Sequence, residues 1–148
     1  MSNFQIISIN ISKKRGEKKN PVSTAELKKD FGIVNDAHAD GTHRQISLLG
    51  IESIEKIREK AVEANPGDFA ENITTKGINL YSLPIGTKLS LGDKVEIEIT
   101  QIGKECHDRC AIFQKVGDCV MPREGVFARI IKEGIIKKWD WGKVNHAP

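Results

Sequence analysis

A β-strand is predicted by residues 93–100, which read Asp93-Lys94-Val95-Glu96-Ile97-Glu98-Ile99-Thr100. Apolar and polar side chains alternate here, so the apolar side chains share one face and the glutamates share the other. Such alternation is typical of a strand that packs one face against a core and turns the other toward water. Ile102 falls on the opposite parity, so we expect a bulge or the end of the strand within residues 101–103.

Glycines divide the sequence before this strand at the spacing of hairpin turns in a barrel or a sandwich. They are Gly77, Gly86 and Gly92. Runs rich in apolar residues predict further strands at 4–12, 46–49 and 126–131. One amphipathic helix is predicted as well, because Ile51, Ile54 and Ile57 recur at helical spacing among charged residues. The turn Asn65-Pro66-Gly67 is expected to end this helix. The expected fold class is therefore mostly β (α+β).

Length and composition limit the function classes. A chain of 148 residues is expected to form a single domain, residues 1–148. Three cysteines, an odd number, argue against a secreted disulfide scaffold. The N-terminus does not resemble a signal peptide, and no run approaches the roughly 18 apolar residues of a membrane helix. We therefore expect a cytoplasmic protein without a membrane partner. Nucleic acid is not expected either, because one Tyr and two Trp offer few stacking platforms.

A basic stretch near the N-terminus carries much of the net charge of +3. Its cations are Lys13, Lys14, Arg15, Lys18 and Lys19, and Glu17 opposes them. Two interpretations stay open. The stretch is either a solvated loop or a positive rim for an anionic ligand such as a phosphate.

Residues 103–110 read Gly-Lys-Glu-Cys-His-Asp-Arg-Cys and carry the candidate chemistry. A thiolate is the reactive form of cysteine, and the cations His107 and Arg109 would favour it, although Glu105 and Asp108 oppose this effect. Two other interpretations remain. The cysteines are ordinary buried side chains, or they belong to a structural zinc site. The zinc ligands would be Cys106, His107, Cys110 and Cys119.

The chain resembles the MOSC domain family, the domain found at the C-terminus of molybdenum cofactor sulfurases. The matching pieces occur in the expected order: Asn35–Ala39, His43–Ser47, Pro66–Ile73, Leu83–Thr87, Gln101–His107, Cys119–Gly125 and Val126–Arg129. The likeness is greatest to the short, stand-alone bacterial members. It implies a mixed β-barrel with a site for molybdopterin. This chain departs from the family at Trp139-Asp140, where the family usually has Gly-Asp.

The resemblance also implies candidate site residues. In the family a single cysteine is either the molybdenum ligand or a persulfide carrier, and the motif order places it at Cys106. The amidoxime-reducing branch has an Arg-Cys pair instead, which would point to Cys110. The candidate cofactor-binding residues are His43, Arg44, Glu71, Asn72, Arg109, Arg123 and Arg129. Asn72 has a structural alternative, in which its amide binds the backbone of a turn. His38 and His43 are a weaker candidate metal pair.

Three functions follow as hypotheses. In the first, the chain is a molybdenum-dependent oxidoreductase module that reduces N-hydroxylated or similar substrates, with the Cys106 thiolate as molybdenum ligand. Its electrons would come from a separate protein, because the sequence has no flavin fingerprint and no cysteine set for an iron–sulfur cluster. In the second, Cys106 carries a persulfide received from a cysteine desulfurase. The third is a cofactor-binding domain without catalysis.

Overall fold

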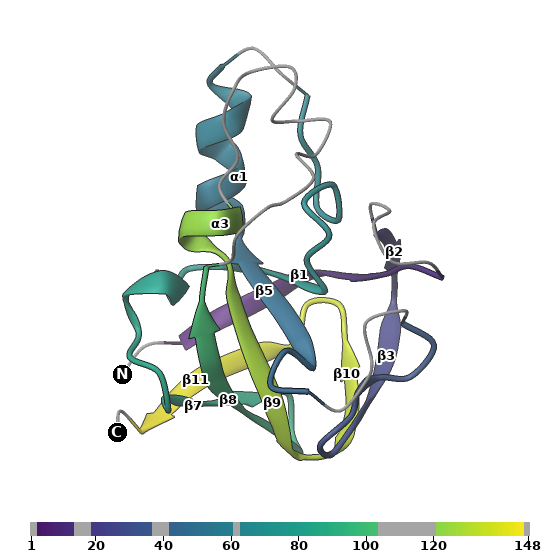
Figure 1. The fold of residues 1–148 in the computed structure, drawn as a ribbon. Helices are drawn as coiled ribbons and strands as arrows, with labels where there is room; N and C mark the ends of the chain where they lie inside the picture. The colour runs from purple at the N-terminus through teal and green to yellow at the C-terminus, as the bar shows by residue number, and fades with distance from the viewer. Residues whose placement is uncertain (1–2, 14–18, 37–41, 61–62, 104–120, 147–148) are drawn as a thin grey trace.

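The computed structural model describes residues 3–13, 19–36, 42–60, 63–103 and 121–146, and Figure 1 shows their arrangement. The strands are β1 (Asn3–Ile11), β2 (Asn20–Val22), β3 (Thr24–Lys28), β4 (Gly32–Ile33), β5 (Ile46–Gly50), β6 (Ile73–Lys76), β7 (Lys88–Leu91), β8 (Val95–Ile102), β9 (Val126–Lys132), β10 (Gly134–Lys137) and β11 (Trp141–His146). The helices are α1 (Ile51–Arg58), the 3-10 turn η1 (Leu80–Ser82) and α3 (Met121–Glu124). No helix of this described part has the length and apolar composition needed to cross a membrane.

The strands close into a mixed barrel, as predicted. Within the described residues the order around the barrel is β11-β7-β8-β9-β5-β6-β1, and β1 pairs back onto β11. β5 and β6 run parallel, and α1 lies on the connection between them. The remaining pairs in this ring are antiparallel. β2 extends the sheet beyond β1, and β10, β3 and β4 form a second small sheet beside the barrel.

The alternation in residues 93–100 produces the inner and outer faces of β8. Val95, Ile97 and Ile99 are buried in the barrel core, whereas the glutamates between them are partly exposed. The register of β8 against β9 shifts between Ile99 and Gln101, which confirms the irregularity expected near the end of the strand. β8 ends at the end of the barrel where α1 and α3 lie (Figure 1), and Gln101, near the end of the strand, is partly exposed.

Helix α1 covers a second apolar cluster outside the barrel. Its buried side chains pack against Leu49, Phe69 and Phe127. The predicted helix is confirmed, but it ends at Arg58 rather than at the Asn65-Pro66-Gly67 turn. Arg58 Nε donates to the Ala64 carbonyl at 2.7 Å, and Ala64 is buried in the same cluster. α1 therefore ends before the predicted turn, and Ala64 packs into the cluster that the helix covers.

The basic stretch does not behave as one surface feature. Lys13 is exposed, but Lys19 is buried and its ammonium lies 2.7 Å from Asp36 Oδ1. Lys19 also donates to the Ser12 hydroxyl at 3.2 Å. Neither interpretation of the stretch, solvated loop or rim for an anion, holds for Lys19, because a buried lysine requires an internal partner. Residues 14–18 lie outside the described residues.

Candidate functional site

Residues 104–120, here called the cysteine segment, connect β8 to α3, and the described residues that flank the segment lie close together. Cys106, His107, Arg109, Cys110 and Cys119 lie outside the described residues, as does His38. The described residues on either side of the segment meet, because the Gly103 N–H donates to the Gly125 carbonyl at 2.6 Å. Gly103 has φ 72°, a left-handed conformation that favours glycine, where the chain leaves β8. This junction is therefore the described part of the molecule that is nearest in sequence to the candidate cysteines.

A polar group, here called the Gln101 cluster, surrounds the junction. It consists of His43, Arg44, Thr100, Gln101 and Gly103. Gln101 Oε1 accepts hydrogen bonds from His43 Nε2 at 2.8 Å and from Arg44 Nε at 3.1 Å. Gln101 Nε2 donates to the Gly103 carbonyl at 2.7 Å, and the Thr100 hydroxyl donates to the His43 carbonyl. One amide thus joins two predicted site residues to the last described residue before the cysteine segment.

Sequence reasoning missed Gln101, although a signal was present. The parity change predicts a bulge or the end of the strand within residues 101–103, and a bulge turns the next side chain in a new direction. Bulges are frequent beside active sites for this reason. Only the fold shows that β9 pairs with both β5 and β8, and that His43 and Arg44, just before β5, reach Gln101 near the end of β8.

Arg44 lies above an aromatic side chain. Its guanidinium carbon is 5.3 Å from the centre of the Phe127 ring, within the range of a cation–π contact. Phe127 belongs to β9 and is buried between β5 and the apolar cluster under α1. The ring and Gln101 together orient Arg44, so its charge is held in place on the outer face of the barrel beside the junction.

Arg129 lies farther along β9 and already has anionic partners. It pairs with Glu98 at 3.2 Å and lies 3.9 Å from Asp30. Arg129 is half-exposed on the outer face of the barrel. Its charge is therefore partly neutralised by these carboxylates. Arg123 is exposed on α3, which follows the cysteine segment.

The far end of the cysteine segment is attached to α1. Glu124, the last residue of α3, accepts a hydrogen bond from the Ser53 hydroxyl at 2.6 Å. It also accepts two from Lys56 Nζ, at 2.8 and 2.9 Å. These hydrogen bonds to Glu124 raise the pKa of Lys56, whose ammonium also lies 5.4 Å from the centre of the Tyr81 ring. The residues on both sides of the cysteine segment are therefore held in place by hydrogen bonds to described residues.

Asn72 is inside the protein, where other groups occupy its amide. Its Oδ1 accepts from the Ser47 N–H at 3.0 Å and the Ser47 hydroxyl at 3.3 Å. Its Nδ2 donates to the Asn10 carbonyl at 3.2 Å and to Asp36 Oδ2 at 3.1 Å. Burial alone would raise the pKa of Asp36, but hydrogen bonds from Lys19, Ser12 and Asn72 lower it overall. This network holds the start of β5, and so the segment that carries His43 and Arg44.

Glu71 is fully buried next to this network. Its Oε2 accepts from the Gly67 N–H at 3.0 Å and the Thr74 hydroxyl at 2.9 Å. Its Oε1 has no hydrogen-bond partner within the described residues. Burial raises the pKa of Glu71 to about 7, although backbone N–H groups and Thr74 oppose the rise. Glu71 and Asn72 thus both lie in the interior, whereas the contacts of the Gln101 cluster lie at the surface.

No group of three His, Cys, Asp or Glu side chains among the described residues could hold a metal ion. The possible zinc ligands lie outside these residues. His43, half of the weaker histidine pair, is instead bonded to Gln101. In the described part, the arrangement at the junction offers cationic and amide donors, which suit an anionic or polar ligand rather than a bare metal ion.

The family can now be stated. The MOSC domain model matches residues 35–140 of the chain, which include β5, β8, β9 and the cysteine segment. The chain belongs to the MOSC domain family. The match begins before the Gln101 cluster and ends at Asp140, so it covers all the candidate site residues.

Solved structures share the fold of this MOSC domain. The YuaD protein from Bacillus subtilis is 16% identical, with a TM-score of 0.83 over 99% of this chain and 97% of that one. YiiM from Geobacillus stearothermophilus is 18% identical, with a TM-score of 0.72 over 97% of this chain and 75% of that one. YiiM from Escherichia coli is 15% identical, with a TM-score of 0.69 over 98% and 71%. A comparison with curated protein sequences gave no match.

Proposed function

We propose that this MOSC domain binds the molybdenum cofactor beside the Gln101 cluster and supplies the Cys106 thiolate as a ligand to molybdenum. The observation that carries the proposal is the position of His43 and Arg44. Both are bonded through Gln101 to Gly103, three residues before Cys106 in sequence. These polar side chains therefore lie where the chain leaves β8, three residues before the candidate thiol in sequence.

The described donors fit the chemistry of molybdopterin, which carries a phosphate and a polar pterin. A guanidinium that is fixed by an amide and an aromatic ring suits a phosphate, because less conformational freedom is lost on binding. Arg44 meets this description, and the imidazole of His43 adds a second polar group beside it. Arg109, Arg123 and Arg129 are the further candidates, and for Arg129 binding competes with Glu98. We assign Glu71 and Asn72 a supporting role, because Asn72 binds Ser47 of β5 and Glu71 binds the Gly67 N–H, both in the interior.

The bound cofactor would supply a redox centre for two electrons. The protein's part is to hold it: a soft thiolate at Cys106 suits the metal, and the cationic donors suit the phosphate. In the proposed reaction an N-hydroxylated substrate loses its oxygen as water, which consumes two electrons and two protons. The electrons would come from a separate electron-transfer protein.

Metal analysis of protein produced in the presence of molybdate tests this proposal. We expect near-stoichiometric molybdenum in the wild type, loss in Cys106→Ala and retention in Cys110→Ala. Retention in Cys106→Ala with loss in Cys110→Ala would move the metal ligand to Cys110. Absence of molybdenum together with cyanide-labile sulfur on Cys106 would favour the persulfide carrier. If both molybdenum and cyanide-labile sulfur are absent, the remaining hypothesis is a cofactor-binding domain without catalysis.

A further inference from the structure

Both tryptophans of the chain are exposed on one side of the barrel. Trp139 is 55% exposed and Trp141 is 64% exposed. Gln5 lies between them, because it pairs with Trp141 across β1 and β11 and its side-chain amide donates to the Trp139 carbonyl at 3.1 Å. Two exposed indoles, two residues apart and both next to Gln5, present an apolar surface of the kind that can mark a partner site.

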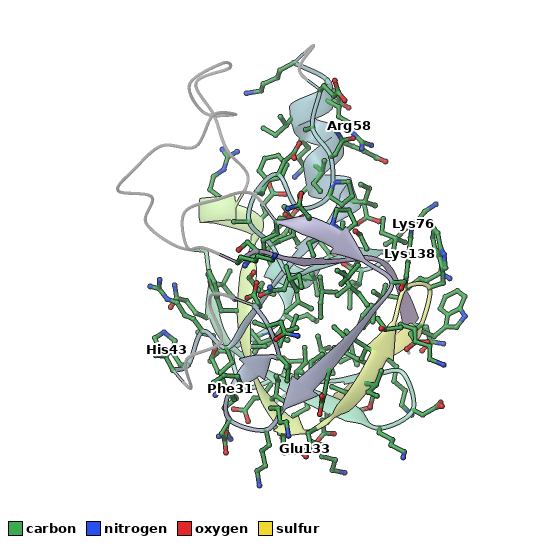
Figure 2. The ribbon with its side chains drawn as sticks, turned by 90° about the vertical axis from the view of Figure 1, so that its right-hand side faces the viewer. Phe31, His43, Arg58, Lys76, Glu133 and Lys138 are labelled. Atoms are coloured by element: carbon green, nitrogen blue, oxygen red, sulfur yellow. The ribbon has the colours of Figure 1, made fainter. Side chains whose placement is uncertain are left out.

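Lysines surround these indoles. Lys76 pairs with Gln5 across β1 and β6, so it shares the outer face of the sheet with Trp141. Lys138 Nζ lies 4.8 Å from the centre of the Trp139 ring. We call this surface the tryptophan–lysine patch: Gln5, Lys76, Lys137, Lys138, Trp139, Trp141 and Lys143. Figure 2 shows Lys76 and Lys138 on the side of the barrel away from His43.

The patch is positively charged. Its four lysines are exposed, and two carboxylates lie close to it. Asp140 accepts the Lys137 N–H at 2.8 Å, and Glu52 accepts the Gly77 N–H at 2.8 Å. Both carboxylates are therefore engaged by the backbone, and the lysines leave a net positive charge around the indoles.

The backbone at Trp139 is strained. Trp139 has φ 77° in a turn that the Asp140 N–H closes onto the Lys137 carbonyl at 3.0 Å. This turn position strongly favours glycine, because a side chain there crowds the backbone. Strained residues persist where function requires them. An indole that is both exposed and strained therefore points to a binding role.

From this patch we infer that the protein docks reversibly on anionic lipid bilayers. Indoles suit the interface between headgroups and acyl chains, and lysines suit the lipid phosphates. A second copy of the chain is a poorer partner, because it would place like charges opposite each other. Protein interfaces are depleted in lysine. Stacking of nucleic acid bases is disfavoured, because Lys138 already covers one face of the Trp139 ring. The inference revises the expectation of no membrane partner.

Intrinsic fluorescence tests the inference directly, because the chain has no tryptophan outside the patch. The full chain is mixed with vesicles of roughly three parts phosphatidylcholine to one part phosphatidylglycerol, or of phosphatidylcholine alone. We expect a blue shift of emission and co-sedimentation with the anionic vesicles only, both lost as salt is raised. Lys76→Gln and Lys143→Gln should each lower the partition coefficient about fivefold.

Matched variants make the result decisive. Lys28→Gln removes an exposed lysine from the far end of the β3–β10 pair and should bind like the wild type. Trp139→Gly should bind more weakly without loss of folding, since glycine suits the turn. Absence of binding, equal binding to both vesicles, or equal losses in Lys28→Gln and Lys76→Gln would overturn the inference. So would tighter binding to an oligothymidylate or to an acidic peptide than to anionic vesicles. Molybdenum content does not enter this test, so the proposed function stands or falls separately.

Discussion

At the scale of single residues, Gln101 makes three hydrogen bonds with different functions. Two orient His43 and Arg44, and the third holds Gly103. These contacts are partly exposed, so each contributes about 1 kcal/mol or less to stability. Their larger effect should be on geometry, because a donor that is free to rotate binds an anion less well than one held in place.

We therefore expect Gln101→Met to lower cofactor occupancy about tenfold while the free energy of unfolding falls by only about 1 kcal/mol. Cofactor content and urea unfolding of the same preparations measure the two effects. Glu96→Gln is the control, since it changes another side chain of β8, one that bonds to Asn145 and not to His43, Arg44 or a candidate cofactor-binding residue. Unchanged occupancy in Gln101→Met would show that the cluster does not position the cofactor.

Trp139 is the residue at which this chain departs from the Gly-Asp of its family. Its φ of 77° is the conformation that a glycine there would adopt without strain. Removing this strain in Trp139→Gly should raise the free energy of unfolding by about 1–2 kcal/mol. The greater entropy of glycine in the unfolded chain offsets part of that increase. Loss of the exposed Lys138 contact subtracts roughly another 0.5 kcal/mol.

Trp139→Gly should therefore raise the free energy of unfolding by about 0.5 kcal/mol, a shift in Tm of one to two degrees or so. The control is Trp141→Gly, in which an extended strand residue is replaced and stability should fall by about 1 kcal/mol. Calorimetry of the three proteins gives the comparison. Equal destabilisation by both glycines would contradict the strain argument.

At the scale of elements, α3 depends on its attachment to α1. A helix of four residues has little stability of its own. Ser53 and Lys56 on α1 bind the Glu124 carboxylate, and the Ser53 contact is largely buried. Hydrogen bonds to a charged group contribute about 1.5–3 kcal/mol when they are shielded from water.

Glu124→Ala should lower the free energy of unfolding by about 2 kcal/mol, and Ser53→Ala by about 1 kcal/mol. Lys56→Met should cost less, because the ammonium is half-exposed and screened by water. Urea unfolding measures all three, and Glu55→Ala, an exposed residue of the same helix, provides the control. A loss in Glu55→Ala as large as in Glu124→Ala would mean that α3 is not held by this contact.

At the scale of the whole molecule, two buried carboxyls give stability opposite dependences on pH. The pKa of Glu71 is about 7 in the folded protein and 4.5 in the reference state, so the folded state holds the proton more tightly. Stability from this group is present below pH 4.5 and is lost as pH rises through about 7. The pKa of Asp36 is lowered, so its contribution is present above its reference value of 3.8 and is lost at lower pH.

The free energy of unfolding should accordingly fall by roughly 3 kcal/mol between about pH 5 and pH 8. Glu71→Gln should abolish most of this slope, since an amide does not ionise. Asp36→Asn should keep the slope between about pH 5 and pH 8, and should change the pH dependence of the free energy of unfolding only at lower pH. Chemical denaturation across the pH range checks all three proteins. A wild-type curve that is flat from pH 5 to pH 8 would contradict the assignment of the slope to Glu71.

Much of the barrel was predictable, because apolar side chains repeat with the period of a strand in β8 and with the period of a helix in α1. Alternation over residues 93–100 depends only on which face is buried, and the isoleucines of α1 repeat for the same reason. The end of α1 was not predictable, because Arg58 finds its acceptor at Ala64 through packing. The burial of Lys19 was hidden too, because its partner Asp36 lies 17 residues away in sequence.

The sequence by itself indicated the family and the strands with a clear alternation, since these depend on residue types and spacing along the chain, and the family match confirms the first. The candidate thiol at Cys106 stays a prediction. Only the tertiary structure decided which side chains share a site. It brought His43 and Arg44 to Gln101, and it moved Glu71 and Asn72 into the interior. The reason is physical: the register between β5, β9 and β8 determines which residues meet, and that register results from closing the whole barrel.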